Sequence, residues 1–311
     1  MQLKKFKRTL DSVTVTPYAE KVSNCARGDS AMIKTLMVFT DGSDGGTIAS
    51  RYAISLAKRL HAKLSGCHIL DSRMLEGPLM ADISGWVGAQ PFSGQLSQFR
   101  DLMQQKGEAI LANLSSMAEK EGVDIELVLK MGHPARIILD ESLRTEMIVL
   151  GQNGEHAELT GDFIGSTVER VARQCLKMSL ITPSTFEPID KILCAFDGSA
   201  HAGKALREAI EFALALQAPL VILTVAESHN LSAAREIAEA GLQIARAHEC
   251  AAANLVLEGR PDQIIPMKAE ELGSDLIVVG AFGHSRIREM ILGSTTTSLI
   301  ARSRKPVLLV R

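Results

Sequence analysis

The sequence has 311 residues, of which 46% are hydrophobic and 23% charged, a composition typical of a globular protein of about two domains. Its net charge of -2 does not indicate a nucleic-acid partner, and no apolar run approaches the roughly 20 residues of a membrane span. Its five cysteines are scattered without a CxxC pair, which predicts neither a disulfide framework nor a zinc site. We therefore expect a cytoplasmic protein with no nucleic-acid or membrane partner.

The first elements follow an N-terminal segment, residues 1–31, which has no apolar block like that of a secretory signal and which we expect to be a flexible extension. From residue 35 the chain reads as strand, turn, helix and strand, TLMVFTDGS to CHILD. Residues 72–100 then contain the one tryptophan, Trp86, and several glycines and prolines. We expect an irregular surface excursion here; a lid or a partner-binding segment is the alternative.

Four landmarks occur twice along the chain in the same order, which predicts an internal duplication. Each half has an apolar strand followed by Asp-Gly-Ser, a Gly-x-Pro turn, an apolar strand that ends in glycine, and a Gly-Ser pair before a helix. The boundary is predicted near Pro183 to Pro188, and the domains are expected at residues 32–184 and 188–311. The insertion at about 72–100 belongs to the first domain.

The fold class follows from the strands, which are near-continuous apolar runs and do not alternate. Such runs indicate burial on both faces, as in a parallel sheet covered by helices. The intervening segments carry apolar residues at helical spacing, such as Leu206, Ile210 and Ala213. The sequence thus predicts an α/β protein with two tandem doubly wound units, each a five-stranded parallel sheet flanked by helices.

The second half contains a loop suited to phosphate: Gly280-x-x-Gly283, nine further residues, and then Gly293-Ser294. Gly280 ends a predicted parallel strand, at the sheet edge where such folds bind ligands, and glycine allows the backbone to approach a ligand closely. Ser294 opens a helix whose free N–H groups and positive dipole end favour an anion. Alternatively, the glycines only turn the chain and Ser294 is an ordinary N-cap.

This G-x2-G-x9-G-[ST] pattern, with an aspartate just after the first strand, resembles that of the universal stress protein family. The resemblance extends in two copies from Ile33 to Arg311 and implies ATP bound at the strand ends; ADP or AMP as the occupant, and an accompanying Mg²⁺, are left open. It places Asp197 near the ribose and adenine and the main chain of Val225 at the adenine. The residues that it places around the phosphates and ribose are Gly280, Gly283, Gly293, Ser294 and Thr295.

The first half departs from this pattern, because ten residues separate its second and third glycines. Two acids, Glu155 and Glu158, enter this loop, and negative charge near a phosphate is unfavourable unless it is offset. Whether the first half binds a nucleotide is left open. Its candidate residues are Asp41, Ile69, Gly151, Gly154, Gly165 and Ser166.

Catalytic motifs are missing from the sequence: it has no GxxxxGK[ST], no GxGxxG after a strand, no HExxH and no GxSxG. We predict no catalytic or metal-binding residues. The expected function is a stress-response regulator that binds an adenine nucleotide mainly through the second domain, with slow hydrolysis or none. The alternatives are a phosphotransfer or ATP-hydrolysing enzyme and a scaffold that binds no nucleotide.

The C-terminal strand PVLLV would be an unpaired apolar edge in an isolated second unit, and such edges invite aggregation. Single-unit members of the family commonly pair through their last strands, so the resemblance implies that the tandem is such a dimer in one chain. The strand MSLITP of the first half is the expected partner of PVLLV. We also expect a homodimer of whole chains and a protein partner that the sequence does not identify.

Overall fold

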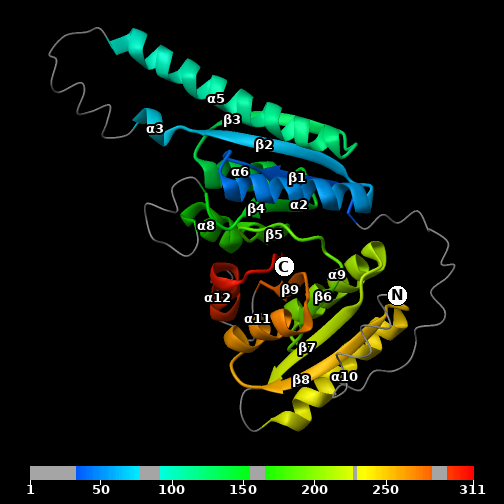
Figure 1. Cartoon of the computed structure of the whole chain (residues 1–311). Helices are drawn as coiled ribbons and strands as arrows, with labels where there is room; N and C mark the ends of the chain where they lie inside the picture. Colours follow the sequence, from blue (N-terminus) through cyan, green and yellow to red (C-terminus); the bar gives the residue numbers. More distant parts are fainter. Residues whose placement is uncertain (1–32, 77–91, 155–164, 227–229, 282–292) are drawn as a thin grey trace.

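The computed structural model describes residues 33–76, 92–154, 165–226, 230–281 and 293–311 (Figure 1). Ten strands form a single sheet in the order β3-β2-β1-β4-β5-β10-β9-β6-β7-β8. The strands are β1 (Thr35–Phe39), β2 (Lys63–Asp71), β3 (Ile125–Gly132), β4 (Met147–Gly151), β5 (Met178–Thr182), β6 (Ile192–Ala195), β7 (Leu220–Ala226), β8 (Ala252–Glu258), β9 (Leu276–Gly280) and β10 (Val307–Val310).

The helices form a layer on each face of this sheet. One layer contains α2 (Asp44–Leu60), α5 (Phe92–Lys120), α9 (Ala200–Leu216) and α10 (Leu231–Ala247). The other contains α6 (Pro134–Ser142), α8 (Ser166–Gln174), α11 (Pro261–Leu272) and α12 (Ser294–Arg302). A short helix, α3 (Arg73–Glu76), follows β2.

Both sheet faces are apolar because successive strand residues point to opposite sides. In β1, Leu36 and Val38 belong to the core under α2, whereas Met37 and Phe39 belong to the opposite core. Each core runs through both halves of the chain. The near-continuous apolar strands of the sequence are thus explained by burial on two faces, and the predicted α/β fold class is confirmed.

The two halves meet through their last strands, as predicted. Strands β5 and β10 pair antiparallel, with Leu308 opposite Leu180, whereas the other neighbouring strands of the sheet pair parallel. The sheet is therefore continuous across the junction. Because the halves run in opposite directions, the carboxyl ends of their strands lie at opposite edges of the sheet.

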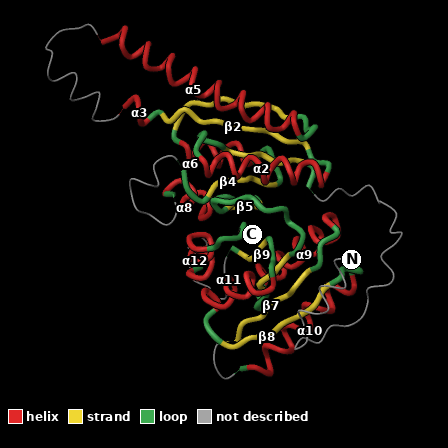
Figure 2. Tube along the Cα trace, in the orientation of Figure 1, coloured by secondary structure: helices red, strands yellow, loops and turns green. Residues whose placement is uncertain are grey.

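The insertion at about 72–100 was predicted to be irregular, but the parts of it that the structure describes are largely helical, in α3 and the start of α5. Helix α5 starts at Phe92 and has 29 residues, compared with 17 in α10. Its first turns extend past the ends of the strands (Figures 1 and 2), where Leu102 is 61% exposed. Residues 77–91, including Trp86, lie outside the described residues. Among the described helices, none is long and apolar enough to cross a membrane.

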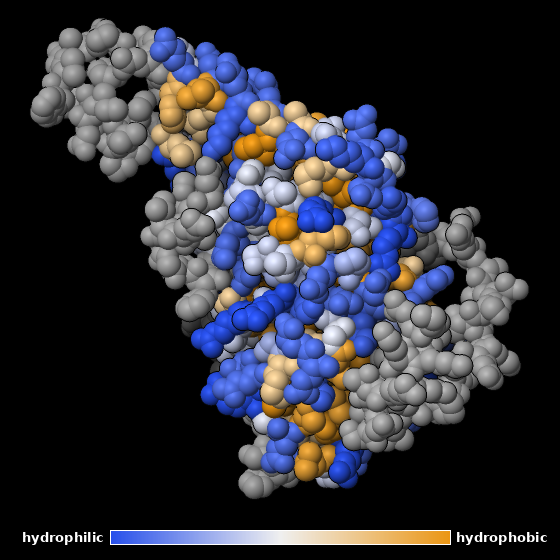
Figure 3. Space-filling view, viewed as in Figure 1, coloured by the Kyte–Doolittle hydropathy of each residue, from blue (hydrophilic) through white to orange (hydrophobic). Residues whose placement is uncertain are grey.

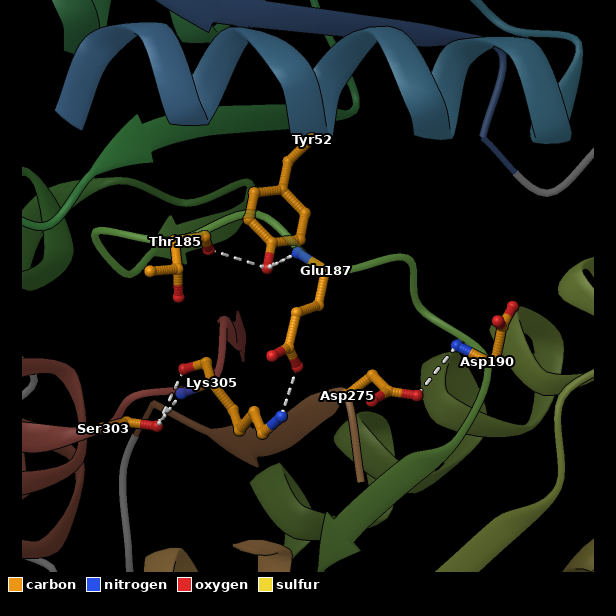
Figure 4. A network of polar contacts seen from close by, with 7 residues as sticks. All are labelled: Tyr52, Thr185, Glu187, Asp190, Asp275, Ser303 and Lys305. Carbon is orange, nitrogen blue, oxygen red and sulfur yellow. Dashed lines mark hydrogen bonds and ion pairs between the residues drawn. The ribbon is translucent and has the colours of Figure 1, made fainter. Parts of the chain in front are cut away.

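The segment between the halves is held by Tyr52 of α2 (Figure 4). The Tyr52 hydroxyl donates to the carbonyl of Thr185 at 3.3 Å and accepts the N–H of Glu187 at 3.1 Å. The ring of Phe186 meets the Tyr52 ring edge-on, with centroids 4.8 Å apart, and the Glu187 carboxylate pairs with Lys305. Burial raises the pKa of Tyr52 to about 12. The linker is thereby tied to both halves.

Candidate functional site: the carboxyl edges of the two half-sheets

In each half the strand order reverses beside the first strand, between β1 and β4 and between β6 and β9. Open α/β sheets bind ligands in the crevice at such a switch point, outside the carboxyl ends of the strands. Asp41 follows β1 and Gly151 ends β4, while Asp197 follows β6 and Gly280 ends β9. The structure therefore brings these four predicted residues to the two switch points.

Each aspartate organises a tight turn between its strand and the next helix. In the first half the Asp41 carboxylate accepts the N–H of Ser43 at 3.0 Å, and the Ser43 hydroxyl caps α2 by accepting the N–H of Gly46 at 3.1 Å. The residue between them, Gly42, has a φ of 81°, which favours glycine. The second half repeats this turn with Asp197, Gly198, Ser199 and Ala202.

The strand-end glycines are required by close backbone packing. A Cβ on Gly151 would lie 2.7 Å from the carbonyl oxygen of Gly45, and a Cβ on Gly280 would lie 2.9 Å from the carbonyl carbon of His201. Gly45 and His201 occupy the first turns of α2 and α9. At each switch point the end of one strand thus touches the beginning of the helix that follows its neighbour.

In the first half one loop glycine, Gly154, touches the aspartate, and another, Gly165, lies at the end of β4. A Cβ on Gly154 would lie 2.6 Å from Oδ2 of Asp41, so the carboxylate rests directly against this glycine. The N–H of Gly165 donates to the carbonyl of Gln152 at 3.1 Å, which brings the start of α8 back to the end of β4. Ser166, the first residue of α8, is exposed beside it.

In the second half the same arrangement is visible in part. Gly283 lies outside the described residues, as does the rest of 282–292. Gly293 precedes α12, Ser294 begins it and Thr295 follows, and the hydroxyl of Thr296 donates to the carbonyl of Gly280 at 3.3 Å. The first turn of α12 is therefore anchored to the end of β9.

Both loop helices begin at a glycine, which has no side chain with which to cap them. No described side chain caps either helix, so their first N–H groups could bind an anion, which the helix dipole also favours. The first turn of α8 contains Glu169, whose carboxylate pairs with Arg173, whereas the first turn of α12 contains no acid. The start of α12 is thus the more favourable of the two for a phosphate.

Ile69 and Val225 lie near the ends of β2 and β7, and their half-buried side chains pack against the core beneath α6 and α11. The neighbouring residues have a role that the sequence did not suggest. His68 Nδ1 lies 2.8 Å from the carbonyl oxygen of Thr40, and the Thr224 hydroxyl donates to the equivalent carbonyl, of Phe196, at the same distance. Each fixes the residue before a site aspartate.

No group of three or more metal-ligating side chains that could hold an ion occurs in the described ranges. Behind the second site, burial and then the charge of Asp197 raise the pKa of the Cys194 thiol. This cysteine therefore stays neutral and functions as a small core residue. In the described residues, each switch point is formed by backbone groups, hydroxyls and one carboxylate.

Comparisons with known proteins agree with this arrangement. The model of the universal stress protein family matches residues 32–183 and 188–311. Universal stress protein Slr1230 of Synechocystis sp. is 30% identical over 295 residues, covering 90% of this chain and 100% of that protein. Universal stress protein MJ0531 of Methanocaldococcus jannaschii is 28% identical over 154 residues, covering 49% of this chain and 83% of that protein.

A solved structure gives the same fold. The crystal structure of a universal stress protein from Archaeoglobus fulgidus DSM 4304 matches with a TM-score of 0.70 and 21% identity, covering 89% of this chain and 98% of that one. The family model accounts for both halves of the sequence in succession. The chain therefore belongs to the universal stress protein family and contains two tandem copies of the family's unit.

Proposed function

We propose that this universal stress protein is a regulator that binds an adenine nucleotide, with ATP, ADP or AMP as the ligand, chiefly at the switch point of its second half. The observation that carries the proposal is the meeting of an aspartate turn, a strand-end glycine and an uncapped helix start at that edge. Asp197 would face the ribose and adenine, and the main chain of Val225 would contact the adenine. Gly280 would let the protein backbone approach the ligand closely. Gly283, outside the described residues, belongs to the proposed loop.

The phosphates would be bound at the start of α12, by the N–H groups that follow Gly293 and by the hydroxyls of Ser294 and Thr295. The Thr296 hydroxyl would keep this turn at the strand end through its bond to Gly280. The first half has the same framework but carries Glu169 in its helix and Glu155 and Glu158 in its sequence. We therefore propose weaker nucleotide binding at Asp41, Ile69, Gly151, Gly154, Gly165 and Ser166.

Binding without rapid turnover fits the polar groups at these edges. The Asp41 and Asp197 carboxylates accept hydrogen bonds from the turns that they organise, at 3.0 and 2.9 Å, which favours a structural role over that of a general base. A Mg²⁺ ion, where it binds, would be held mainly by the nucleotide's phosphates, and it would neutralise part of their charge. The nucleotide would then act as a signal that changes the protein's shape or its partners.

The test is isothermal titration calorimetry with ATP, ADP and AMP, together with cAMP and dAMP, with which two universal stress proteins of known structure form complexes. Gly293→Asp is the key variant, because aspartate is a good N-cap that preserves α12 while placing a carboxylate where the phosphates would lie. Gly165→Asp is its matched control in the first half. We expect about one tight equivalent per chain, lost in Gly293→Asp and retained in Gly165→Asp.

Unchanged affinity in Gly293→Asp, or no binding of any of the five nucleotides, would refute the assignment of the nucleotide to the second-half site.

A phosphate-release assay distinguishes a regulator that binds the nucleotide from an enzyme that hydrolyses ATP. We expect fewer than one phosphate released per chain over the time of the binding experiment. Multiple turnovers that disappear in Asp197→Ala would instead establish an enzyme. Light scattering tests the proposed homodimer, which would have about twice the chain mass of 33.5 kDa.

A further inference from the structure

A cavity of about 580 Å³ lies at the junction of the two halves, apart from the second-half switch point. One wall consists of Gln152 and Asn153, which follow β4, and of linker residues 183–185. The other wall is residues 301–304, from the last turn of α12 and the turn before β10. This volume lies within the range of about 300–1,000 Å³ that is usual for small-molecule sites.

The walls of this junction cavity are fixed by hydrogen bonds. The Gln152 amide donates to the carbonyl of Ala301 at 2.6 Å, which joins the end of β4 to the end of α12. The Ser303 hydroxyl donates to the carbonyl of Lys305 at 2.7 Å, and the carbonyl of Thr185 accepts the Tyr52 hydroxyl (Figure 4). A ligand would therefore meet a largely preorganised cavity.

The charge of the cavity comes from two arginines. Among the described residues, Arg302 and Arg304 are the only charged ones that line the cavity, and the side chain of neither forms an ion pair or a hydrogen bond with any of them. The neighbouring cation, Lys305, is already paired with Glu187. Strongly hydrophilic side chains gather over α12 and the junction on the face shown in Figure 3. The cavity thus combines two uncompensated positive charges with amide and hydroxyl groups.

We propose that the junction cavity is a second ligand site that binds a small phosphorylated anion through Arg302 and Arg304. Guanidinium groups form paired, charge-assisted hydrogen bonds with phosphate oxygens, and two of them on one wall match a ligand with two phosphoryl groups. The amide of Asn153 would supply a further polar contact from the opposite wall. Both halves contribute to the cavity, so it requires that they be joined through β5 and β10. The cavity borders the first-half switch point, because Gln152 and Asn153 lie between Gly151 and Gly154, but it contains none of the residues proposed for the second-half nucleotide site.

Inorganic pyrophosphate is the probe, measured by calorimetry on the full chain in the Gly165→Asp, Gly293→Asp background, in which both loop helices carry a carboxylate at their start. We expect binding of pyrophosphate that is weakened at least tenfold by Arg302→Gln with Arg304→Gln. The matched control is Arg170→Gln with Arg207→Gln, which removes two exposed arginines that do not line the cavity and should leave the affinity unchanged.

Three outcomes would overturn the proposal: no pyrophosphate binding in the background protein, equal binding in the cavity variant, or equal weakening in the control. In the first case, binding that appears when Gly165 is restored would assign the pyrophosphate to the first-half loop. Thermal melting of each variant shows that the fold is retained. Raising the salt from 0.05 to 0.5 M should weaken binding in the background protein and affect the cavity variant less.

Discussion

Replacement of Gly280 by alanine should destabilise the protein, because the new methyl group meets backbone atoms. It would lie 2.9 Å from the carbonyl carbon of His201 and 3.1 Å from the amide nitrogen of Ala202. Carbon atoms in contact are normally about 3.5–4.0 Å apart, so β9 and the first turn of α9 would have to separate. Backbone of a packed helix cannot move aside as the end of a long side chain can. Overpacking of this kind costs about 1–3 kcal/mol.

The chain offers a control on α9, the helix that Gly280 contacts. An alanine Cβ at Gly203 would meet no atom within 4 Å, and a helical Gly→Ala change stabilises by about 0.5–1 kcal/mol. The two variants should therefore shift stability in opposite directions, although each adds one methyl group. Urea unfolding followed by circular dichroism gives the free energies, and the melting temperature should change by roughly 2–4 °C per kcal/mol.

Equal stabilities of the two variants, or a Gly280→Ala protein as stable as the parent, would show that the strand end does not touch the helix as described. A second measurement connects packing with function. Displacement of α9 also moves the Asp197 turn, so the affinity for the nucleotide should fall in Gly280→Ala and remain unchanged in Gly203→Ala.

Three further changes test other parts of the structure. Ultraviolet titration should show a tyrosine with a pKa of about 12, and this titration should be absent from Tyr52→Phe. Because the pKa of Tyr52 in the folded protein exceeds the usual 10, the neutral hydroxyl contributes its full stability below pH 10, and this contribution is lost between about pH 10 and 12. Tyr52→Phe should also lower the free energy of unfolding, measured with urea, by about 1–3 kcal/mol, because the linker loses two hydrogen bonds, each of which contributes about 0.5–1.5 kcal/mol. Burial raises the pKa values of Cys67 and Cys250 to about 12, so at pH 8 these thiols should react with a thiol reagent only after unfolding; the measurement uses a Cys25→Ser protein. Fast reaction of the native protein would contradict the burial of these cysteines. Gly42→Ala should lower the free energy of unfolding by about 1–2 kcal/mol in the same urea assay, because alanine is strained at a φ of 81° and its methyl group would lie 2.8 Å from the Ile110 side chain. A stability equal to that of the parent would contradict the described conformation of the Asp41 turn.

The architecture could be predicted because each decisive signal is local. The apolar runs of β1 and β9 indicate burial on both faces, and the repeated order of turns indicates two copies of one unit. The pairing of β5 with β10 followed from the family resemblance, which implies that the units pair through their last strands, together with the need to cover an apolar edge. The start of α5 could not be predicted in this way. Its first turns contain Ser93 and Gly94 and follow a stretch rich in glycine and proline, which are signals of irregular structure, although Phe99 and Met103 have helical spacing and are half-buried.

For the candidate site, the aspartates and glycines were predictable because turn chemistry and close backbone approach restrict the residue type. The residues that support them were not. His68 and Thr224 bond to equivalent carbonyl groups, but they are different residue types. A comparison of the two halves of the sequence therefore does not identify them as equivalent positions. In the sequence, Thr296 is only one of several hydroxyl residues at the start of a predicted helix, and only the fold shows that it reaches back to Gly280. The junction cavity requires both halves in place, and no local pattern predicts it.

The pairing of β5 with β10 has a consequence for the history of the chain. Because apolar cores continue across this ladder, each half contributes to the folding of the other whether or not it holds a ligand. One copy is therefore free to accumulate changes in its loop, such as the additional residue and the two glutamates between Gly154 and Gly165, without loss of the common structure. Gene duplication with fusion would in this way permit one site to diverge while the other retains the ancestral ligand.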